Sequence, residues 1–155
     1  MDLSNASVLD IVVDPMVLRT VSRPLIRVDE AIQALACDML ATMYAAGGVG
    51  LAAIQIGRPF RVIVFDVAGE GRPPAPEVMI NPVIEWSKKL RIEMEEGCLS
   101  IPGRKVIVSR PSDIRVAYTQ LDGTRRTRDL GGMQARVVQH EIDHLDGVLI
   151  TSRQS

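Results

Sequence analysis

The sequence predicts an α+β fold, organised as one domain over residues 1–155. Two segments with helical periodicity lie toward the two ends of the chain. The stretch between them consists of short segments rich in β-branched residues, and it contains a hairpin turn signal. The order of helix, several antiparallel strands and helix belongs to the α+β class. A chain of 155 residues is long enough to bury a core without cross-links.

The first half of the chain is expected to hold one long helix and one buried strand. Residues 28–44 predict a helix because apolar side chains recur there at helical spacing. These side chains are Ile32, Leu35, Ala36, Met39, Leu40 and Met43. The preceding stretch DPMVLRTVSRPL contains two prolines and predicts an extended arm over the core. RVIVFDV, at 61–67, predicts a strand, and AGEGRPPAPE predicts a surface loop.

The second half is expected to hold several short strands and a final helix. Strand-like pieces occur in VMINPVIEW, LRIEMEE, KVIVS and DIRVAYTQ, and LDGT marks a hairpin turn. The last periodic segment runs from about residue 133 to residue 145. Gly147 follows at the position where a glycine commonly caps the C-terminal end of a helix.

Composition excludes several classes of protein. A net charge of −1 provides no basic surface, so direct nucleic-acid binding is not expected. No apolar run approaches the roughly 18 residues that span a bilayer, so a membrane partner is not expected either. The N-terminus is acidic and unlike a secretory signal. Two cysteines form no disulfide framework, so we expect reduced thiols and a cytoplasmic location.

The only two histidines of the chain lie in QHEIDH, within the final helix. His140 and His144 are four residues apart, so they share one helix face and can bind one metal ion. Glu141 beside them suits a general base that acts on metal-bound water. A short HExxH pattern also arises by chance, and then the two histidines face solvent. Val137 and Met133 continue the same face as an apolar wall, either beside a substrate or simply in the core.

A third metal ligand must come from upstream. Catalytic sites of this kind use three protein ligands and leave one position open. In the extended protease pattern HExxHxxGxxH, the third histidine would fall at Ile150, which cannot bind a metal. No glutamate follows His144 to serve as the third ligand of the other common protease type, so both types are disfavoured. Cys98, in EEGCLSIPG, is the candidate, because a thiolate binds zinc or ferrous iron strongly. The alternative for a lone cysteine is a small buried apolar residue.

Three segments together resemble the signature motifs of the peptide deformylases. They are GVGLAAIQ at 48–55, EGCLS at 96–100 and QHEIDH at 139–144, in the family's order and at similar separations. The resemblance extends to DPMVLRTVSRP, to INP at 80–82 and to HLDGVL, so it covers nearly the whole chain.

The resemblance implies a hydrolase that removes the formyl group from the N-terminal formyl-methionine of newly made proteins and releases formate. It also implies antiparallel sheets packed around a helix that carries the HExxH motif. One divalent ion per chain is implied, Fe²⁺ in the cell, with Zn²⁺, Ni²⁺ or Co²⁺ able to replace it. The implied ligands are Cys98, His140 and His144, and Glu141 is the implied proton carrier.

The resemblance also assigns the groups that contact the substrate. Gln55 and the backbone N–H of Leu99 would stabilise the negative charge that grows on the formyl oxygen. The peptide would pair with main chain near Val49, Gly50 and Gly97, as an added strand does. The methionine side chain would enter a pocket, and the residues implied for it are Val49, Met94, Met133 and Val137.

The sequence departs from familiar deformylases at three places. The residue before GVG is often glutamate and here is Gly47, which is expected to loosen the rim of the pocket. Many members have an aspartate and then an arginine after the GVL[FI] segment, whereas this chain has Thr151, Ser152 and Arg153 there. The chain ends at Ser155, whereas many bacterial members continue into a further helix, in some cases basic and used to dock on the ribosome. Ribosome docking by that route is therefore an open question.

Two alternatives to an active deformylase remain at the level of the sequence. One is a catalytically silent paralogue that keeps the metal as a structural clamp; intact Glu141 and Gln55 disfavour it, as does the lack of a fourth protein ligand. The other is an enzyme of altered specificity that acts on a different acylated amide. That difference would lie in the pocket residues Met94, Met133 and Arg136.

Overall fold

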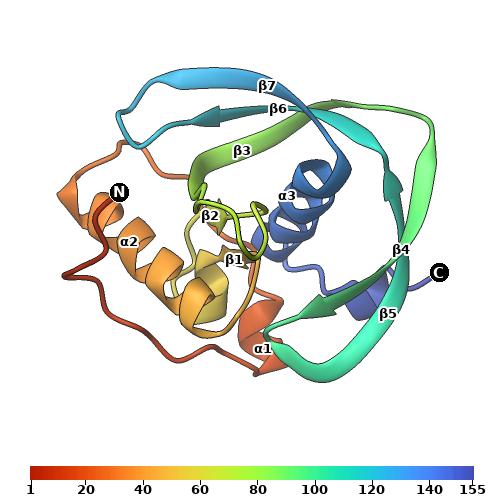
Figure 1. The fold of residues 1–155 in the computed structure, drawn as a ribbon, viewed down its shortest axis with the longest axis horizontal. Coiled ribbons are helices and arrows are strands. Elements are labelled where there is room, and N and C mark those ends of the chain that lie inside the picture. Colours follow the sequence, from red (N-terminus) through yellow and green to blue (C-terminus); the bar gives the residue numbers. More distant parts are fainter.

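The computed structural model describes residues 1–155 and contains two antiparallel sheets and three helices (Figure 1). The larger sheet has the strand order β1-β2-β3-β6-β7, and the smaller one pairs β4 with β5. The strands of the two sheets are β1 Gly50–Ala52, β2 Val62–Phe65, β3 Glu77–Ser87, β4 Arg91–Cys98, β5 Ile101–Pro111, β6 Asp113–Thr119 and β7 Arg125–Gly131. The helices are α1 Pro15–Leu18, α2 Glu30–Ala45 and α3 Gly132–Leu145, with 3₁₀ turns η1 Ala53–Ile56 and η2 Ile150–Ser152. The predicted α+β class is confirmed.

The two long helices pack on opposite faces of the short strands β1 and β2. Side chains of a strand alternate between its two faces. Accordingly, Ile63 and Phe65 of β2 join the apolar cluster that includes α3, whereas Val62 and Val64 join the cluster that includes α2. Both β1 and β2 are buried along their whole length. The centre of the molecule is therefore a strand pair covered by a helix on each side.

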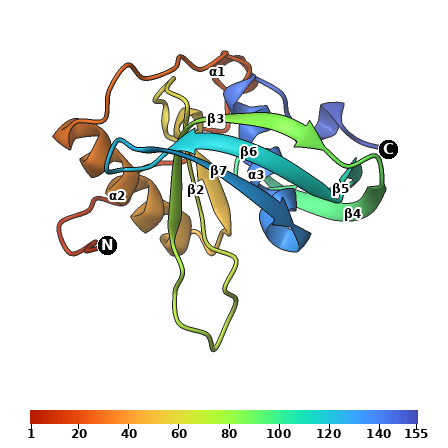
Figure 2. The ribbon, with the colours of Figure 1, turned by 90° about the horizontal axis from the view of Figure 1, so that it is seen from above.

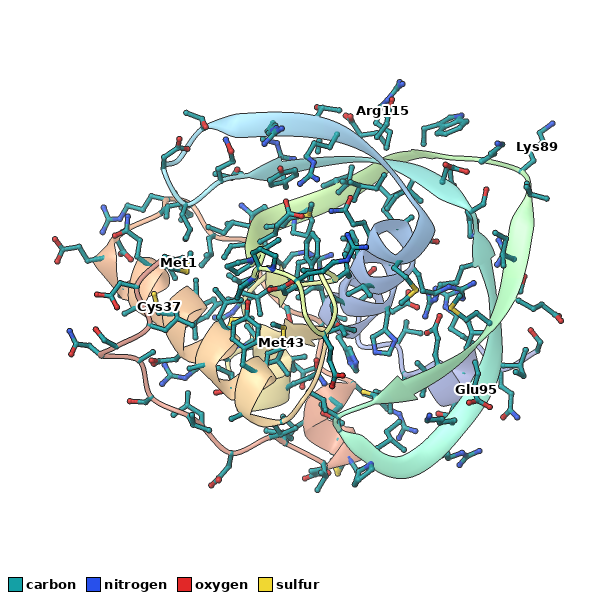
Figure 3. The ribbon with its side chains drawn as sticks, viewed as in Figure 1. Met1, Cys37, Met43, Lys89, Glu95 and Arg115 are labelled. Atoms are coloured by element: carbon teal, nitrogen blue, oxygen red, sulfur yellow. The ribbon has the colours of Figure 1, made fainter.

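Helix α3 runs through the space that the two sheets enclose, as Figure 1 shows. Strands β3, β6 and β7 curve past one side of it, and β4 and β5 lie on another. Every residue from Ala135 to Leu145 is buried. Figure 2 shows the loop between β2 and β3 projecting away from this body. In Figure 3, Arg115 lies at the outer surface of the sheet, whereas Met43 of α2 is wholly buried.

The ends of both long helices follow from their sequences. Asp29 precedes α2, and its carboxylate accepts a hydrogen bond from the backbone N–H of Ile32 at 3.0 Å. After α2 and α3, Gly47 and Gly147 adopt φ angles of 69° and 73°, in the left-handed region. In both cases the N–H of this glycine and the N–H of the next residue donate hydrogen bonds to carbonyl oxygens in the last turn of the helix, which is the Schellman arrangement. At Gly147 a Cβ atom would also lie only 2.4 Å from the backbone oxygen of Arg19.

The predicted elements agree with the structure except in the arm, and β1, η1 and β7 were not predicted. The arm is not extended throughout, because Asp14 caps the one-turn helix α1, with Pro15 in its first turn. Strand β1 and nearly all of turn η1 lie within the GVGLAAIQ motif, for which no secondary structure was predicted. Strand β7 carries arginines and an aspartate, and it is exposed along most of its length, so apolar alternation could not indicate it. None of the helices is long and apolar enough to cross a membrane.

Candidate metal centre and substrate pocket

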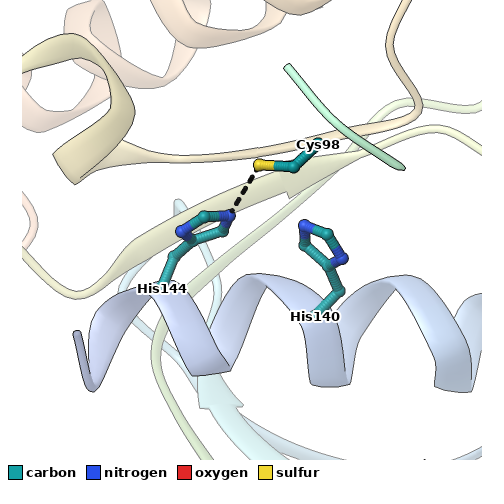
Figure 4. Close-up of side chains that lie close together, drawn as sticks. All are labelled: Cys98, His140 and His144. Atoms are coloured by element: carbon teal, nitrogen blue, oxygen red, sulfur yellow. Dashed lines mark hydrogen bonds between the residues drawn. The ribbon is translucent and has the colours of Figure 1, made fainter. Parts of the chain in front are cut away.

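Three side chains from two distant segments converge beside α3. His140 and His144 lie on adjacent turns of the helix, with ring centroids 5.1 Å apart. Cys98 faces them from the end of β4, and its Sγ lies 3.3 Å from Nε2 of His144 (Figure 4). One ligand atom of each residue lies within 4.8 Å of the others. The structure thus brings together all three residues that the sequence suggests as metal ligands.

Cys98 is positioned by a tight hairpin. It pairs with Ile101, so the turn between β4 and β5 contains only Leu99 and Ser100, and the register shifts between Gly97 and Cys98. Such a shift bends a strand and turns a side chain to a new direction. The chain after α2 lies directly against this turn, because a Cβ on Gly48 would be 2.6 Å from Cδ1 of Leu99.

Glu96 orients the imidazole ring of His140. Its Oε1 lies 3.0 Å from Nδ1 of His140. Because Arg110 and Arg136 keep Glu96 ionised, the carboxylate can only accept, so Nδ1 of His140 carries the proton and Nε2 is the atom left to bind a metal. Burial alone would raise the pKa of Glu96, but its hydrogen bonds hold that pKa well below the usual range. Arg110 donates to both carboxylate oxygens, at 2.6 and 2.9 Å, and Arg136 donates at 2.7 Å.

The electrostatics of the cluster favour one positive charge at His140 and none at His144. Burial alone would lower the pKa of His140, but the surrounding anionic groups, Glu141 first among them, raise it to about 10. Burial, reinforced by the charge of His140, lowers the pKa of His144 to about 3. The cluster therefore accommodates one positive charge and keeps His144 neutral, which is the form of a histidine that binds a metal.

Glu141 is buried beside the metal ligands and is not fully paired. It is 4% exposed, and its Oε1 has no hydrogen-bond partner. Burial raises the pKa of Glu141 to about 7, although the charge of His140 acts against the rise. Gly50 makes room for this carboxylate, because a Cβ there would lie 2.6 Å from Oε2 of Glu141 and 2.7 Å from Cγ1 of Val137. A carboxyl group in this environment can exchange a proton near neutral pH.

Gln55 reaches the cluster from η1, on the other side of Cys98. It is 1% exposed, and its Oε1 accepts a hydrogen bond from the backbone N–H of Ala52 at 2.9 Å. Its Nε2 lies 3.1 Å from Oγ of Ser100 and 3.7 Å from Sγ of Cys98. The amide therefore directs its N–H groups toward the cluster and its oxygen away from it.

A cavity opens next to the cluster and is lined by most of the residues that the sequence suggests for the substrate. Val49, Met94, Gly97, Met133 and Val137 line it, together with Leu99 and the side chains of Cys98, His140 and Glu141. Gly50, Gln55 and His144 lie outside this lining. Val49, Met94 and Met133 are between 39% and 49% exposed, so their apolar surface is available to a ligand.

Comparisons with known proteins identify this arrangement. The family model described as polypeptide deformylase matches residues 8–155. The chain belongs to the peptide deformylase family. A peptide deformylase from Mesorhizobium japonicum is 53% identical over 141 residues, which are 91% of this chain and 80% of the relative. The crystal structure of an Ehrlichia chaffeensis peptide deformylase superimposes with a TM-score of 0.90 at 36% identity, over 96% of this chain and 89% of that one.

A third similar structure is a peptide deformylase from Acinetobacter baumannii with Met-Ala-Ser bound. It has a TM-score of 0.89 at 32% identity and covers 96% of this chain and 99% of its own. Deformylases are metal-dependent hydrolases that remove the N-formyl group from nascent peptides. A catalytically silent or altered-specificity paralogue is not favoured by these relatives.

The donor set of this chain fits the metal that the family requires. One thiolate and two imidazoles suit a divalent transition metal, and three protein ligands leave a position open for water or substrate. The anionic surroundings of His140, described above, point the same way. The fit therefore rests on the chemistry of the side chains as well as on membership of the family.

Sequence reasoning missed the supporting charges around the centre. Glu96 lies within the EGCLS segment, but nothing in that segment indicated that it would bind His140. Arg136 was expected to contribute to specificity. It does touch the cavity, but its guanidinium is buried against Glu96 and the backbone oxygens of Ile92 and Val108. From the sequence alone, Arg136 would be expected to lie at the surface. Only the fold shows that Glu96 is its buried partner.

Proposed function

We propose that residues 1–155 act as one catalytic domain that removes the formyl group from the N-terminal formyl-methionine of newly synthesised proteins. We propose Fe²⁺ as the natural ion, one per chain, held by Cys98, His140 and His144. The observation that carries this proposal is the Cys/His/His cluster beside an apolar cavity, with a buried carboxyl group next to it. Zn²⁺, Ni²⁺ and Co²⁺ suit the same ligands.

Glu141 is the proposed proton carrier. A divalent ion at this position would lower the pKa of a water ligand toward about 7 and polarise the formyl carbonyl. The raised pKa of Glu141, about 7, suits a group that takes a proton from that water and later gives it to the leaving amine. Oε1 of Glu141 has no hydrogen-bond partner, so no protein group competes for this oxygen during the two transfers.

Gln55 and Leu99 are the proposed donors to the formyl oxygen. Negative charge grows on that oxygen as the carbonyl carbon is attacked, and fixed N–H groups stabilise it without having to reorient. Removing one such donor typically costs about 3 kcal/mol in the transition state. Nε2 of Gln55 faces the cluster, and Leu99 follows the ligand Cys98 directly.

The peptide is proposed to bind in an extended form. Strands β1 and β4 each have only one strand neighbour, so each leaves one edge free for an added strand near Val49, Gly50 and Gly97. The methionine side chain is proposed to enter the cavity, where Val49, Met94, Met133 and Val137 supply apolar walls. Met-Ala-Ser bound to the similar Acinetobacter baumannii protein supports a peptide that begins with methionine.

The test is the release of formate from a formyl-Met peptide. Protein purified without oxygen and loaded with Fe²⁺ or Ni²⁺ is expected to turn over, and Glu141→Ala is expected to lose activity while retaining metal. Glu93→Ala, which removes an exposed carboxylate from β4, is the matched control and should retain activity. A folded, metal-loaded wild type that releases no formate would contradict the proposal.

The identity of the ion needs a separate test. If Fe²⁺ is the working ion, exposure to air should inactivate the iron-loaded enzyme through oxidation of the iron and of Cys98. The nickel-loaded enzyme should keep its activity under the same conditions. Equal activity of the iron-loaded enzyme before and after prolonged aerobic storage would count against an oxygen-sensitive ferrous centre.

A further inference from the structure

Ser100 is a buried polar residue beside the metal centre to which the proposed reaction gives no role. It is 3% exposed, and its hydroxyl accepts a buried hydrogen bond from Nε2 of Gln55 at 3.1 Å. The two residues are far apart in the chain and belong to different elements, η1 and the turn between β4 and β5. This bond therefore joins two segments that each supply a group to the site.

The partners of Gln55 decide which way its amide points. The backbone N–H of Ala52 is a donor, so the atom that it meets at 2.9 Å must be the amide oxygen. The hydroxyl of Ser100 then accepts from the amide nitrogen on the other side. The reverse orientation would set two donors against each other at Ala52. The N–H of Ala52 thus selects the orientation of the amide, and the Ser100 hydroxyl, which can donate or accept, adapts to it and holds the nitrogen end in place.

Ser100 also follows Leu99 in the two-residue turn that starts at the metal ligand Cys98. The amide nitrogen of Gln55 lies 3.1 Å from Ser100 and 3.7 Å from Sγ of Cys98, so it bridges the two ends of this turn. Any movement of the turn relative to η1 would therefore change the separation between the Gln55 amide and the backbone N–H of Leu99.

We propose that Ser100 is a positioning residue that holds the Gln55 amide and the Leu99 N–H in register, so that both point at one formyl oxygen. This inference rests on the proposed function. One N–H of Gln55 is held by the Ser100 hydroxyl, and the other, which faces Sγ of Cys98, is the one proposed to turn to the substrate. Ser100 itself does not touch the reacting atoms.

Removal of the hydroxyl is expected to lower kcat and to leave KM nearly unchanged. In Ser100→Ala the freed N–H has no buried acceptor except the ligand sulfur, so only the bond from Ala52 to the amide oxygen still holds the amide and its nitrogen end can move. Loss of a complete oxyanion donor lowers kcat about 10²–10³-fold, and a misplaced donor should cost less, about 10- to 100-fold. KM should change by less than about threefold, because the apolar pocket still binds the methionine side chain.

A double-mutant cycle separates this role from a purely structural one. Ser100→Ala should lower kcat in the wild-type background, but it should cause no further loss in a Gln55→Ala background if Ser100 acts through Gln55. Ser100→Thr retains the hydroxyl and should recover most of the kcat. Ser22→Ala is the matched control, because Ser22 is also 3% exposed but its Oγ has no hydrogen-bond partner. That control should retain wild-type kcat.

A measurement that does not depend on activity is the ¹⁵N NMR signal of the Gln55 side-chain amide in the zinc-loaded protein. The signal is assigned by its loss in Gln55→Ala. Ser100→Ala should shift it and bring its two proton frequencies closer together, whereas Ser22→Ala should leave it in place. An unchanged signal in Ser100→Ala would overturn the proposal, as would wild-type kcat in that variant or equal losses in both backgrounds. Failure of the wild type to release formate would instead contradict the proposed function.

Discussion

Helices α2 and α3 pack on opposite faces of the same two strands, yet they bury very different side chains. The buried residues of α2 are apolar with one exception, Thr42. Helix α3 buries six polar or charged residues: Arg136, Gln139, His140, Glu141, Asp143 and His144. Buried charge is costly unless it is paired, whereas buried apolar area stabilises the fold directly. One helix therefore mainly supplies stability, and the other mainly supplies chemistry at some cost in stability.

The polar residues of α3 are themselves divided into two groups. Toward β5, Asp143 accepts hydrogen bonds from Arg110 and Arg153, and Arg110 continues the network to Glu96. In the second group, Oε1 of Glu141 and Nδ1 of His144 have no partners. Buried polar atoms without a partner are uncommon in folded proteins, and a catalytic role is one reason for them. The paired side of α3 therefore holds the helix in place for the unpaired side.

The largest effect on stability is expected from Glu96→Ala, which breaks the buried network behind α3. It would leave Arg110 and Arg136 with less opposing charge in a buried site. Loss of one partner from a buried pair costs about 3–5 kcal/mol of unfolding free energy. Metal affinity should also fall, by about 10- to 100-fold, because His140 loses the acceptor that orients it. Denaturant unfolding and metal titration measure the two effects.

The neighbouring residue provides the control for that variant. Glu95 is exposed, and its contact with Lys105 is a surface pair at 3.9 Å. Such pairs contribute about 0–1 kcal/mol, so Glu95→Ala should unfold almost as the wild type does. Similar losses in the two variants would show that the buried network does not support α3.

A core substitution in α2 should affect stability alone. Met39 is wholly buried and belongs to the apolar cluster between α2 and the sheet. Met39→Ala should lower the unfolding free energy by about 3 kcal/mol, through lost transfer energy and the cavity left behind. The kcat of the metal-loaded enzyme should stay unchanged, because Met39 is on the far side of the strands from the site. Met16→Ala, at an 82% exposed position, is the control and should cost little.

This difference between the helices also explains how well each could be predicted from the sequence. In α2, apolar spacing indicated the helix, and Asp29 and Gly47 correspond to its two ends. In α3, the same spacing indicated the helix, and the His140–His144 pair indicated a metal. Strand β7 and helix α1 were not predicted, because one is largely charged and the other is a single turn fixed by a cap.

The residues that support the metal ligands and Gln55 could not be predicted, for a physical reason. Cys98 was found because metal chemistry demanded a third ligand, and its residue type limited the choice. Glu96, Arg110 and Ser100 act through contacts between segments far apart in the chain. No local pattern encodes such contacts, since a charged residue that will be buried looks the same in sequence as one that faces solvent.

A smaller effect with a pH signature is expected at the C-terminal end of α2. Oη of Tyr44 donates to Oδ2 of Asp66 at 2.5 Å. Burial alone would raise the pKa of Asp66, but this bond and two backbone N–H groups lower it. The lowered pKa means that the bond contributes its full stability above about pH 4, the ordinary range of an aspartate, and loses it as the pH falls further.

Tyr44→Phe should therefore destabilise the protein by about 1 kcal/mol at pH 7 and by less at pH 3. Unfolding of the variant and the wild type at both pH values measures this difference. In an Asp66→Asn background, the effect of Tyr44→Phe should no longer depend on pH. A difference of constant size from pH 7 to pH 3 in the presence of Asp66 would contradict the ionised acceptor.

The smallest effect on stability is expected where the effect on activity is largest. Glu141→Gln keeps the shape of a buried side chain but removes the charge that burial disfavours, as the raised pKa of Glu141, about 7, indicates. The unfolding free energy of the metal-loaded protein should change by less than about 1 kcal/mol, because Oε1 loses no protein partner. The kcat should fall about 10²–10⁴-fold, since an amide cannot carry the proton. A marked loss of stability in this variant would show that Glu141 supports the fold of α3, and the division of the helix into a supporting side and a reactive side would then be wrong.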